Sequence, residues 1–176
     1  MQRVSVVGTS GSGKSTTARW LAAKLGVPHV ELDASFHQAR WQPLPLDEYR
    51  ARVEAVATTK GWVIDGNYSA VRDLVLARAD TVVWLDLPRA LVMRRIIGRT
   101  IRRALTREVL WNGNREPLSN LCRWDPQKNV IRWAWTRHPL DGARLEAAIV
   151  DPALAHLHFV RLRSQREIDA FVAASS

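Results

Sequence analysis

Short, mostly apolar runs alternate along the chain with longer segments in which apolar residues recur every three or four positions. The runs predict buried strands over residues 3–7, 29–33, 62–66, 81–87 and 158–162. The helical spacing predicts helices over residues 14–25, 46–60, 69–79, 88–105, 119–137 with a break at Asp125-Pro126, 140–150 and 165–174. Strands that alternate with helices are typical of an α/β fold with a mainly parallel sheet.

The fifth strand follows the fourth only after a long excursion that begins at Pro88. We expect this excursion to be an insertion over the edge of the sheet, with a lid at about residues 100–140. The length of 176 residues suits one domain, at a prior of about 150 residues per domain. The expected organisation is therefore a single domain over residues 1–176.

Composition excludes several classes of protein. The chain is 47% hydrophobic and 24% charged, as in ordinary globular domains, so global disorder is excluded. The single cysteine, Cys122, cannot form an internal disulfide, and the five histidines show no spacing typical of zinc sites. No apolar run approaches the roughly 18 residues of a membrane span, and the N-terminal residues do not resemble a secretory signal. The expectation is a cytoplasmic protein with no membrane partner.

The net charge of +9 is confined to one segment of the chain. Residues 89–144 hold twelve arginines, one lysine and four acidic residues, so this segment carries the whole excess and the remainder is neutral. A basic excess indicates a polyanionic partner such as a nucleotide, a nucleic acid or an anionic membrane. The basic excess lies between the fourth and fifth predicted strands. The motifs on either side of it are needed to decide among these three kinds of partner.

A glycine-rich motif connects the first strand to the first helix. Residues 8–15 read Gly-Thr-Ser-Gly-Ser-Gly-Lys-Ser, which is a complete phosphate-binding loop between a strand and a helix. Its backbone N–H groups are expected to surround phosphate oxygens, with Lys14 at the β- and γ-phosphates and Ser15 on Mg²⁺. The expected nucleotide-binding residues of this loop are Gly8, Ser10, Gly11, Ser12, Gly13, Lys14, Ser15 and Thr16.

Acidic residues follow three of the predicted strands, at the edge where parallel sheets form nucleotide sites. Asp65, in Trp-Val-Ile-Asp-Gly, has the form closest to a metal-binding acid, and we expect it to hold Mg²⁺ with Ser15. Asp86 is more simply explained as a cap of the following helix. Asp33 is a candidate general base toward an acceptor hydroxyl, a candidate second metal contact, or a cap of a turn.

Four segments resemble the P-loop nucleotide and small-molecule kinases, the group of the adenylate and shikimate kinases. They are GTSGSGKST at 8–16, VIDGNYS at 63–69, TVVWLDLP at 81–88 and RIIGR at 95–99. Within that group the chain looks most similar to bacterial DNA topology modulation proteins related to FlaR. The resemblance implies a three-layer P-loop NTPase fold with a five-stranded parallel sheet in the order 2-3-1-4-5 and helices on both faces. It also implies ATP and Mg²⁺ as cofactors, with Arg95 and Arg99 contacting adenine and phosphate.

The chain departs from adenylate kinases where those enzymes bind their acceptor. In adenylate kinases an arginine follows the third-strand Asp-Gly, whereas here Asn67 and Tyr68 follow it. Where those enzymes have the residues around AMP, this chain has Glu-Leu-Asp-Ala-Ser-Phe-His-Gln-Ala-Arg-Trp at 31–41. A short match of Asp33 and Phe36 is similar to the Asp-x-Phe-Tyr pattern of uridine-kinase-type enzymes. The candidate acceptor-binding residues are Asp33, Phe36, Trp41, Asn67, Tyr68 and Arg123.

The basic segment lies where these kinases keep a mobile lid whose arginines close over the phosphates. Arg132 and Arg137 are the candidate lid arginines, and the candidate catalytic set is Lys14, Asp33, Arg99, Arg132 and Arg137. We therefore expect transfer of the γ-phosphoryl group of Mg·ATP to a small molecule, such as a nucleotide, a nucleoside or another hydroxyl compound. The alternative is an ATP-dependent regulatory ATPase that binds nucleic acid. Both a monomer and a homodimer fit the sequence.

Overall fold

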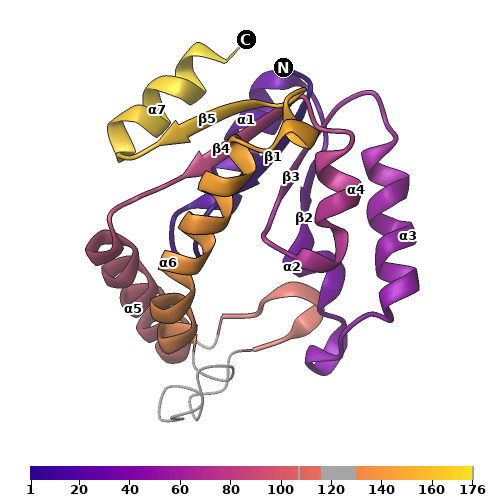
Figure 1. Ribbon diagram of the computed structural model, residues 1–176. Coiled ribbons are helices and arrows are strands. Elements are labelled where there is room, and N and C mark those ends of the chain that lie inside the picture. The colour runs from indigo at the N-terminus through magenta and orange to yellow at the C-terminus, as the bar shows by residue number, and fades with distance from the viewer. Residues whose placement is uncertain (107, 116–129, 176) are drawn as a thin grey trace.

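Five parallel strands form the centre of the molecule. The computed structural model describes residues 1–106, 108–115 and 130–175, so the candidate Arg123 lies outside the described residues. The strands are β1 (Arg3–Val7), β2 (His29–Glu31), β3 (Trp62–Asp65), β4 (Thr81–Leu85) and β5 (His158–Leu162). Their order in the sheet is β2-β3-β1-β4-β5, with every neighbouring pair parallel (Figure 1). This confirms the predicted fold class and strand order.

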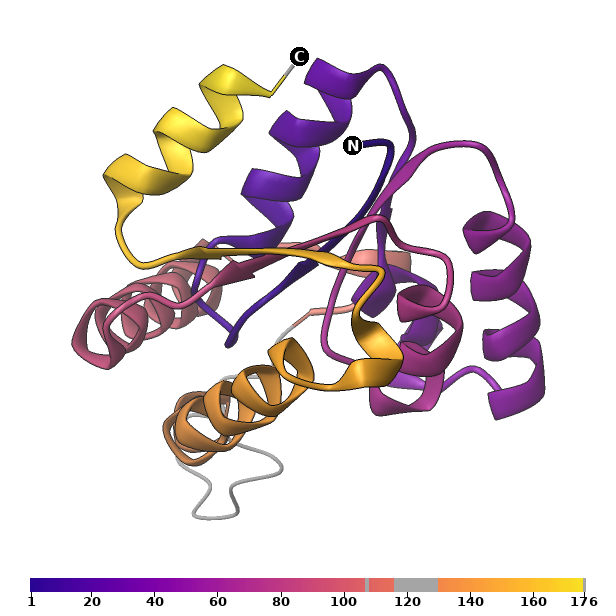
Figure 2. The same cartoon turned by 45° about the horizontal axis from the view of Figure 1, so that its top comes forward.

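Helices cover both faces of this sheet (Figure 2). The helices are α1 (Lys14–Leu25), α2 (Leu32–Phe36), α3 (Leu46–Ala57), α4 (Arg72–Leu76), α5 (Arg89–Thr106), α6 (Val130–Ile149) and α7 (Gln165–Ala174). Helices α1 and α7 lie on one face, and α3, α4 and α6 lie on the other. Among the residues that the structure describes, no helix has both the length and the apolar character to span a membrane.

The alternation of side chains along β3 divides the core in two. Trp62 and Ile64 point toward α3 and α4, whereas Val63 joins the apolar cluster under α1 and α7. All three side chains are buried because β3 lies inside the sheet, between β1 and β2. A small third cluster, formed by Met93, Ile96 and Ala134, joins α5 to α6.

Two local predictions were wrong. The predicted break between residues 137 and 140 is absent, because α6 runs from Val130 to Ile149 with Pro139 inside it. A proline inside a helix costs about 3 kcal/mol. Packing of buried Ala134 against α5 opposes this cost, and the Trp135 carbonyl, which Pro139 cannot bond, accepts from Arg89 Nη2 at 2.6 Å. The second predicted strand also ends early: Leu32 and Asp33 already belong to α2, which turns Asp33 away from the line of the strand.

Trp62 gives a test of the core. Its side chain is fully buried, and its indole Nε1 donates to the Ala57 carbonyl at 3.2 Å. Trp62→Ala should lower the free energy of unfolding by about 3–5 kcal/mol, because it removes apolar contacts and leaves a cavity. Urea unfolding measures this change. Trp20→Ala, at a tryptophan that is 46% exposed, is the matched control and should change stability far less; equal losses in the two variants would contradict this description of the core.

Candidate functional site

The loop between β1 and α1 adopts a backbone that only glycine accommodates at two points. Gly8 and Gly11 have φ values of +145° and +86°. A Cβ atom on Gly8 would lie 2.7 Å from the Leu85 carbonyl oxygen, and one on Gly11 would lie 2.7 Å from Cγ1 of Ile96. The glycines therefore let the loop fold tightly against β4 and α5. No side chain caps the N-terminus of α1, so its first N–H groups remain available to an anion.

Lys14 is the cation of this loop. Among the described residues, its Nζ donates one hydrogen bond, to the Thr9 carbonyl oxygen at 3.2 Å. Burial is the largest influence on this amine and lowers the pKa of Lys14, while the negative charges of Asp33 and Asp65 act in the opposite direction. An ammonium group has three donors, so a bound phosphate would supply both the missing acceptors and a compensating charge. The residues thus fit the expected nucleotide.

Three oxygen-bearing side chains meet beside Lys14. The Ser15 hydroxyl lies 3.0 Å from Glu31 Oε1 and 3.3 Å from Asp65 Oδ1. The other oxygen of buried Asp65 lies 2.7 Å from His29 Nε2, which fixes the orientation of the carboxylate. A hydroxyl with two carboxylates is the kind of donor set that Mg²⁺ prefers, and it normally completes its shell with water and phosphate oxygens. Within the described ranges, no group of three or more His, Cys, Asp or Glu residues could hold a metal by itself.

Glu31 is a residue of this group that sequence reasoning missed. It ends β2, directly beside the end of β3 that carries Asp65, and the register pairs these two residues. The signal was present in the sequence, because Glu31 stands two positions before Asp33 in the same predicted strand. The shorter strand explains the difference, since it is Glu31 rather than Asp33 that terminates β2.

Helix α5 brings two arginines to the phosphate loop. Arg99 Nη2 donates to the Ser10 hydroxyl at 3.1 Å. Arg95 Nη1 donates to the Ser12 carbonyl at 3.4 Å, and its Nη2 donates to Gln165 Oε1 at 2.8 Å. Both side chains therefore reach the loop from one face of the helix, at the spacing of four that the sequence contains.

Asp33 belongs to a chain of three polar side chains. The Tyr68 hydroxyl donates to Asp33 Oδ1 at 2.7 Å, and His37 Nε2 lies 3.2 Å from the same hydroxyl. Because the single hydroxyl hydrogen of Tyr68 goes to Asp33, His37 must carry its proton on Nε2 and donate it to Tyr68. Burial raises the pKa of Tyr68, and burial lowers the pKa of His37 against the opposing charge of Asp33. The candidates Asp33 and Tyr68 are thus together, and His37 is a further member that the sequence did not reveal.

Aromatic rings surround this chain of side chains. The ring of Phe36, another acceptor candidate, lies 5.0 Å from that of Tyr68 and 5.1 Å from that of Tyr49. Trp41 lies further out, where its ring contacts His37 and Trp111 edge-on at 5.3 and 6.3 Å. The structure therefore gives Phe36 a packing role beside Asp33, and it joins Trp41 to the segment that follows α5.

The contact between the segments at Trp41 and Asn114 is specific. The Trp41 backbone N–H donates to Asn114 Oδ1 at 2.8 Å, and its indole N–H donates to the Arg115 carbonyl at 3.1 Å. Asn112 Nδ2 donates to the His37 carbonyl at 2.6 Å. The segment 112–115 is therefore held against the turn that carries His37 and Trp41.

Asn67 has a partner that the acceptor prediction did not include. Its amide Oδ1 accepts from the Gly8 N–H at 3.3 Å, and its Nδ2 donates to the Gly8 carbonyl at 2.9 Å. Asn67 thereby fastens the phosphate loop to the end of β3.

The remaining candidates lie on α6, where the guanidinium of Arg137 faces the ring of Trp133 at 5.7 Å from its centroid and Arg132 is half-buried. Their roles as lid arginines stay predictions.

Asp86 has a structural partner. It forms an ion pair with Arg161 of β5 at 2.7 Å, and the Arg161 guanidinium also lies 4.1 Å from the centroid of the Trp84 ring. This arrangement joins the end of β4 to β5, so Asp86 is occupied away from the group around Ser15.

Comparison with known proteins identifies similar chains among kinases. No family model matches. The chain is 33% identical to an adenylate kinase of Anaeromyxobacter sp. (strain K) over 116 residues, 59% of this chain and 52% of that protein. It therefore spans about half the length of the curated relatives that it matches.

Two solved structures share the fold over nearly the whole chain. A shikimate kinase from Acinetobacter baumannii in complex with shikimate superimposes with a TM-score of 0.55 at 18% identity, covering 98% of this chain and 89% of the other. A gluconokinase from Sinorhizobium meliloti gives a TM-score of 0.51 at 19% identity, covering 98% and 91%. The fold is that of the P-loop kinases. The expected likeness to DNA topology modulation proteins is not supported by these comparisons.

His37 gives a pH-dependent prediction for stability. Because burial holds the pKa of His37 below its unfolded value of about 6.5, the folded protein binds fewer protons here than the unfolded chain. This contribution to stability should be present above about pH 6.5 and lost as the pH falls through the lowered pKa. His37→Gln keeps a donor for Tyr68 and cannot titrate, so the loss of stability between about pH 7.5 and 5 should be smaller than in the wild type.

Urea unfolding at several pH values measures this difference. His156→Gln, at an exposed histidine whose Nε2 lies 3.1 Å from the Leu76 carbonyl oxygen, is the matched control. An unchanged pH dependence in His37→Gln, or the same change in the control, would contradict the assignment.

Proposed function

We propose that this protein is a P-loop phosphotransferase that moves the γ-phosphoryl group of Mg·ATP to a hydroxyl group of a small molecule. The observation that carries this proposal is the group around Ser15. A lysine with one hydrogen bond, an uncapped helix N-terminus and a hydroxyl between two carboxylates lie together at the carboxyl ends of β1, β2 and β3. The kinases named above support the same reaction class. The adenylate kinase matches over 59% of this chain and 52% of its own length, and the two solved structures share the fold.

The chain's own residues can divide the work of the reaction. Lys14 and the N–H groups of residues 8–16 would hold the β- and γ-phosphates, and Ser15, Asp65 and Glu31 would hold Mg²⁺, which supplies positive charge to the phosphates. Arg95 and Arg99 already contact the phosphate loop from α5. Catalysis of phosphoryl transfer consists mainly of positioning and charge neutralisation, and one well-placed arginine can be worth about 10³–10⁵ in rate.

Asp33 is the proposed general base. The acceptor hydroxyl oxygen would form the new bond to the γ-phosphorus while the bond from that phosphorus to the bridging oxygen of ADP breaks. The hydroxyl proton would pass to Asp33, whose Oδ2 remains for this task because Oδ1 accepts from Tyr68. The Tyr68 and His37 hydrogen bonds would hold the carboxylate in one orientation. Arg132 and Arg137 are proposed to approach the phosphates from α6.

The alternative, a nucleic-acid-binding ATPase, stays a prediction. Described arginines of the basic segment have specific partners inside the protein: Arg95 and Arg99 on the phosphate loop, Arg89 over the ring of Trp135, and Arg102 with Glu108. These contacts favour a nucleotide as the polyanion and give no observation that favours a duplex.

The phosphotransferase proposal is tested by product formation. Wild-type protein is incubated with Mg·ATP and a panel of nucleosides, nucleotides, sugars and hydroxy acids, and ADP release is compared with release in the absence of acceptor. At least one acceptor should raise the rate and appear as its phosphate ester by mass spectrometry. Lys14→Met should lower this rate by at least about 10². A panel in which ADP release never exceeds the background would contradict the proposal.

His29 tests the metal-binding part of the proposal. Its hydrogen bond to Asp65 orients the carboxylate, so His29→Ala should raise the Mg²⁺ concentration needed for half-maximal ATP binding by about 10–100-fold. Titration of Mg²⁺ at constant ATP, with binding followed by calorimetry, measures this shift. His158→Ala, at an exposed histidine of β5, should leave it unchanged. An unaltered Mg²⁺ requirement in a folded His29→Ala protein would remove Asp65 from the proposed metal site.

A further inference from the structure

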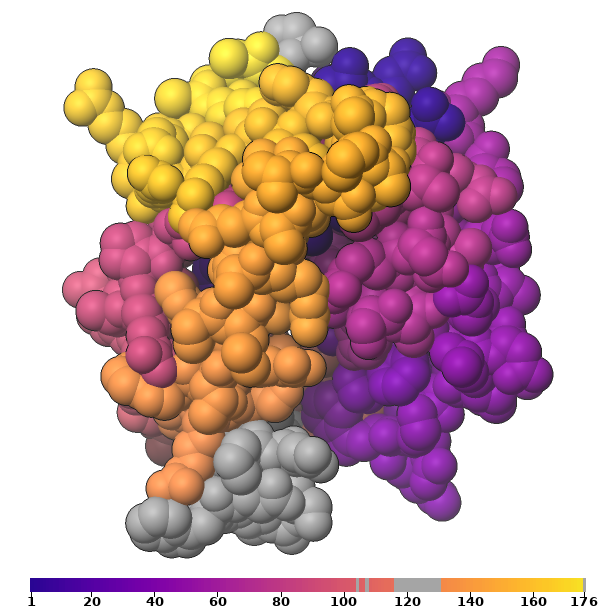
Figure 3. All heavy atoms as spheres, in the orientation of Figure 1, coloured from indigo at the N-terminus to yellow at the C-terminus, as the bar shows by residue number. Residues whose placement is uncertain are grey.

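Residues 111–115 lie against the turn that carries His37. Helix α6 lies across one face of the molecule, beside the surface of α4 (Figure 3). Residues 111–115 take a different course, from the end of α5 to residues 34–41, where α2 ends and the chain turns (Figure 1). Two asparagine side chains, those of Asn112 and Asn114, form hydrogen bonds across this contact.

Asn114 connects the two segments with its whole amide group. The residue is 3% exposed. Its Oδ1 accepts from the Trp41 backbone N–H at 2.8 Å, and its Nδ2 donates to the carbonyl oxygens of Gln38 and Trp111 at 2.8 and 2.9 Å. One donor and two acceptors face this amide, so one orientation of the side chain satisfies all three. Aspartate has the same shape but lacks both N–H donors, so it cannot replace asparagine here.

The turn that Asn114 holds has an unfavourable backbone. Arg40 and Trp41 have φ values of +60° and +58°. Residues with large side chains rarely adopt this left-handed region, because the Cβ atom approaches the carbonyl oxygen, so two of them in succession cost free energy. Asn114 binds the backbone before Arg40, at Gln38, and after it, at Trp41. The contact therefore keeps the turn in a conformation that its own residues disfavour.

The ring of His37 is packed by this contact. It meets the Trp41 ring edge-on at 5.3 Å, and it lies at 6.3 Å from the Trp111 ring with the two planes 21° apart. The carbonyl oxygen of His37 accepts from Asn112 Nδ2 at 2.6 Å. The backbone and the ring of His37 are therefore both held by groups that the contact positions, and a turn that relaxed to negative φ would move the ring.

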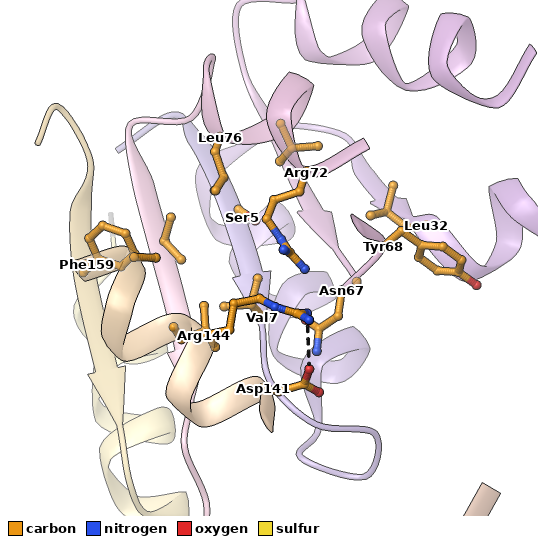
Figure 4. Close-up of a pocket in the computed structure, with 15 residues that line it drawn as sticks. Ser5, Val7, Leu32, Asn67, Tyr68, Arg72, Leu76, Asp141, Arg144 and Phe159 are labelled. Atoms are coloured by element: carbon orange, nitrogen blue, oxygen red, sulfur yellow. Dashed lines mark ion pairs between the residues drawn. The ribbon is translucent and has the colours of Figure 1, made fainter. Parts of the chain in front are cut away.

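Hydrogen bonds continue from this ring to Asp33. Tyr68 lines the cavity between α4 and α6 with its ring, and its hydroxyl points away from that cavity (Figure 4). The hydroxyl accepts from His37 Nε2 at 3.2 Å and donates to Asp33 Oδ1 at 2.7 Å. If the His37 ring moved, the Tyr68 hydroxyl would lose its donor, and the carboxylate of Asp33 would lose its fixed direction.

We propose that Asn114 is a positioning residue for Asp33. It holds the left-handed turn at Trp41, and this turn holds the ring of His37. Through Tyr68, His37 then orients the carboxylate that takes the proton of the acceptor hydroxyl. This inference rests on the proposed phosphotransferase function, because only that reaction gives Asp33 a proton to take. It extends the proposed site to a residue that follows α5 and acts through other side chains.

The state of the His37 ring is measured without any ligand, by NMR of protein with ¹⁵N-labelled histidine. Asn114→Asp keeps the oxygen that faces the Trp41 N–H and lacks both donors. The ring should then leave its buried place, so the midpoint of its titration, which burial lowers in the wild type, should rise toward about 6.5. Ile168→Ala, at a buried residue of α7 on the other face of the sheet, lowers stability without touching the turn and should keep the wild-type midpoint.

Steady-state kinetics test the effect on Asp33. With the acceptor that raises ADP release most in the panel described above, Asn114→Asp should lower kcat by about tenfold or more, because the base is no longer held in place. The dissociation constant of Mg·ATP should not change. A side chain that served stability alone would leave kcat per folded molecule unchanged, as Ile168→Ala should.

Glycine at position 40 tests the role of the strained turn. Glycine adopts positive φ without the cost that a Cβ atom brings, so Arg40→Gly should help the turn to persist without the amide of Asn114. Added to Asn114→Asp, it should raise kcat by at least about twofold. Arg40→Ala removes the same guanidinium and keeps a Cβ atom, so it should give no such rescue. Equal effects of glycine and alanine would overturn the step from Asn114 to the turn.

Asn112→Gly provides the test if the Asn114 variant does not fold. Asn112 is exposed and has a φ value of +55°, which glycine adopts freely, so the substitution removes only the amide that donates to the Ala34 and His37 carbonyls. It should lower kcat and raise the His37 midpoint, in the same directions as Asn114→Asp.

The outcomes separate this proposal from the proposed function. A wild-type kcat and His37 midpoint in the folded asparagine variants, or equal changes in Ile168→Ala, would overturn the positioning role and leave the phosphotransferase proposal standing. If the His37 midpoint rises as expected but no acceptor raises ADP release, the phosphotransferase proposal fails. The positioning role then fails with it, because Asp33 takes no proton.

Discussion

The carboxylate of Asp65 is buried at the carboxyl end of β3, and a buried charge persists only where its oxygens have partners. One oxygen lies 2.7 Å from Nε2 of His29 in β2, and the other lies 3.3 Å from the hydroxyl of Ser15, at the start of α1. This single side chain therefore joins three elements that come together only when the parallel sheet has formed. The position of Ser15, and with it the direction of the phosphate loop, depends on that joint.

Asn67 extends this constraint by two residues. Its amide holds the carbonyl and N–H of Gly8, so the end of β3 fixes the phosphate loop at its first residue as well as at Ser15. The next residue, Tyr68, fixes Asp33 and through its ring lines the cavity under α6. Residues 65–68 thus set the relative positions of the metal group, the phosphate loop and the proposed base. Such a junction at the carboxyl ends of parallel strands is where open α/β sheets bind ligands.

The predictable parts of this arrangement are those that depend on residues close together in the sequence. The phosphate loop needs glycines at fixed positions between a strand and a helix, and each strand shows its own apolar run, so loop and strand order could be predicted. The contacts of Trp41 with Asn114 and of Asn67 with Gly8 join residues far apart in sequence, and no local pattern encodes them. Glu31 was not predicted as a site residue because the second strand was predicted to end two residues later, at Asp33. A helix break was predicted at Pro139, but packing on α6 offsets the local cost of this proline. Local rules fail here where tertiary contacts decide.

The net charge of the chain takes on a different meaning once its arginines have partners. Where an arginine pairs with an acid, as Arg161 does with Asp86, it serves the fold and leaves little charge for a ligand. Where it reaches the phosphate loop, as Arg99 does through the Ser10 hydroxyl, it lies beside the expected nucleotide. Arg72 lies outside the basic segment of the sequence, yet the fold sets its charge beside that of Arg144. The anion-binding capacity of this protein therefore depends on which guanidinium groups the fold leaves without a carboxylate, and the sum of charges along a segment does not determine it.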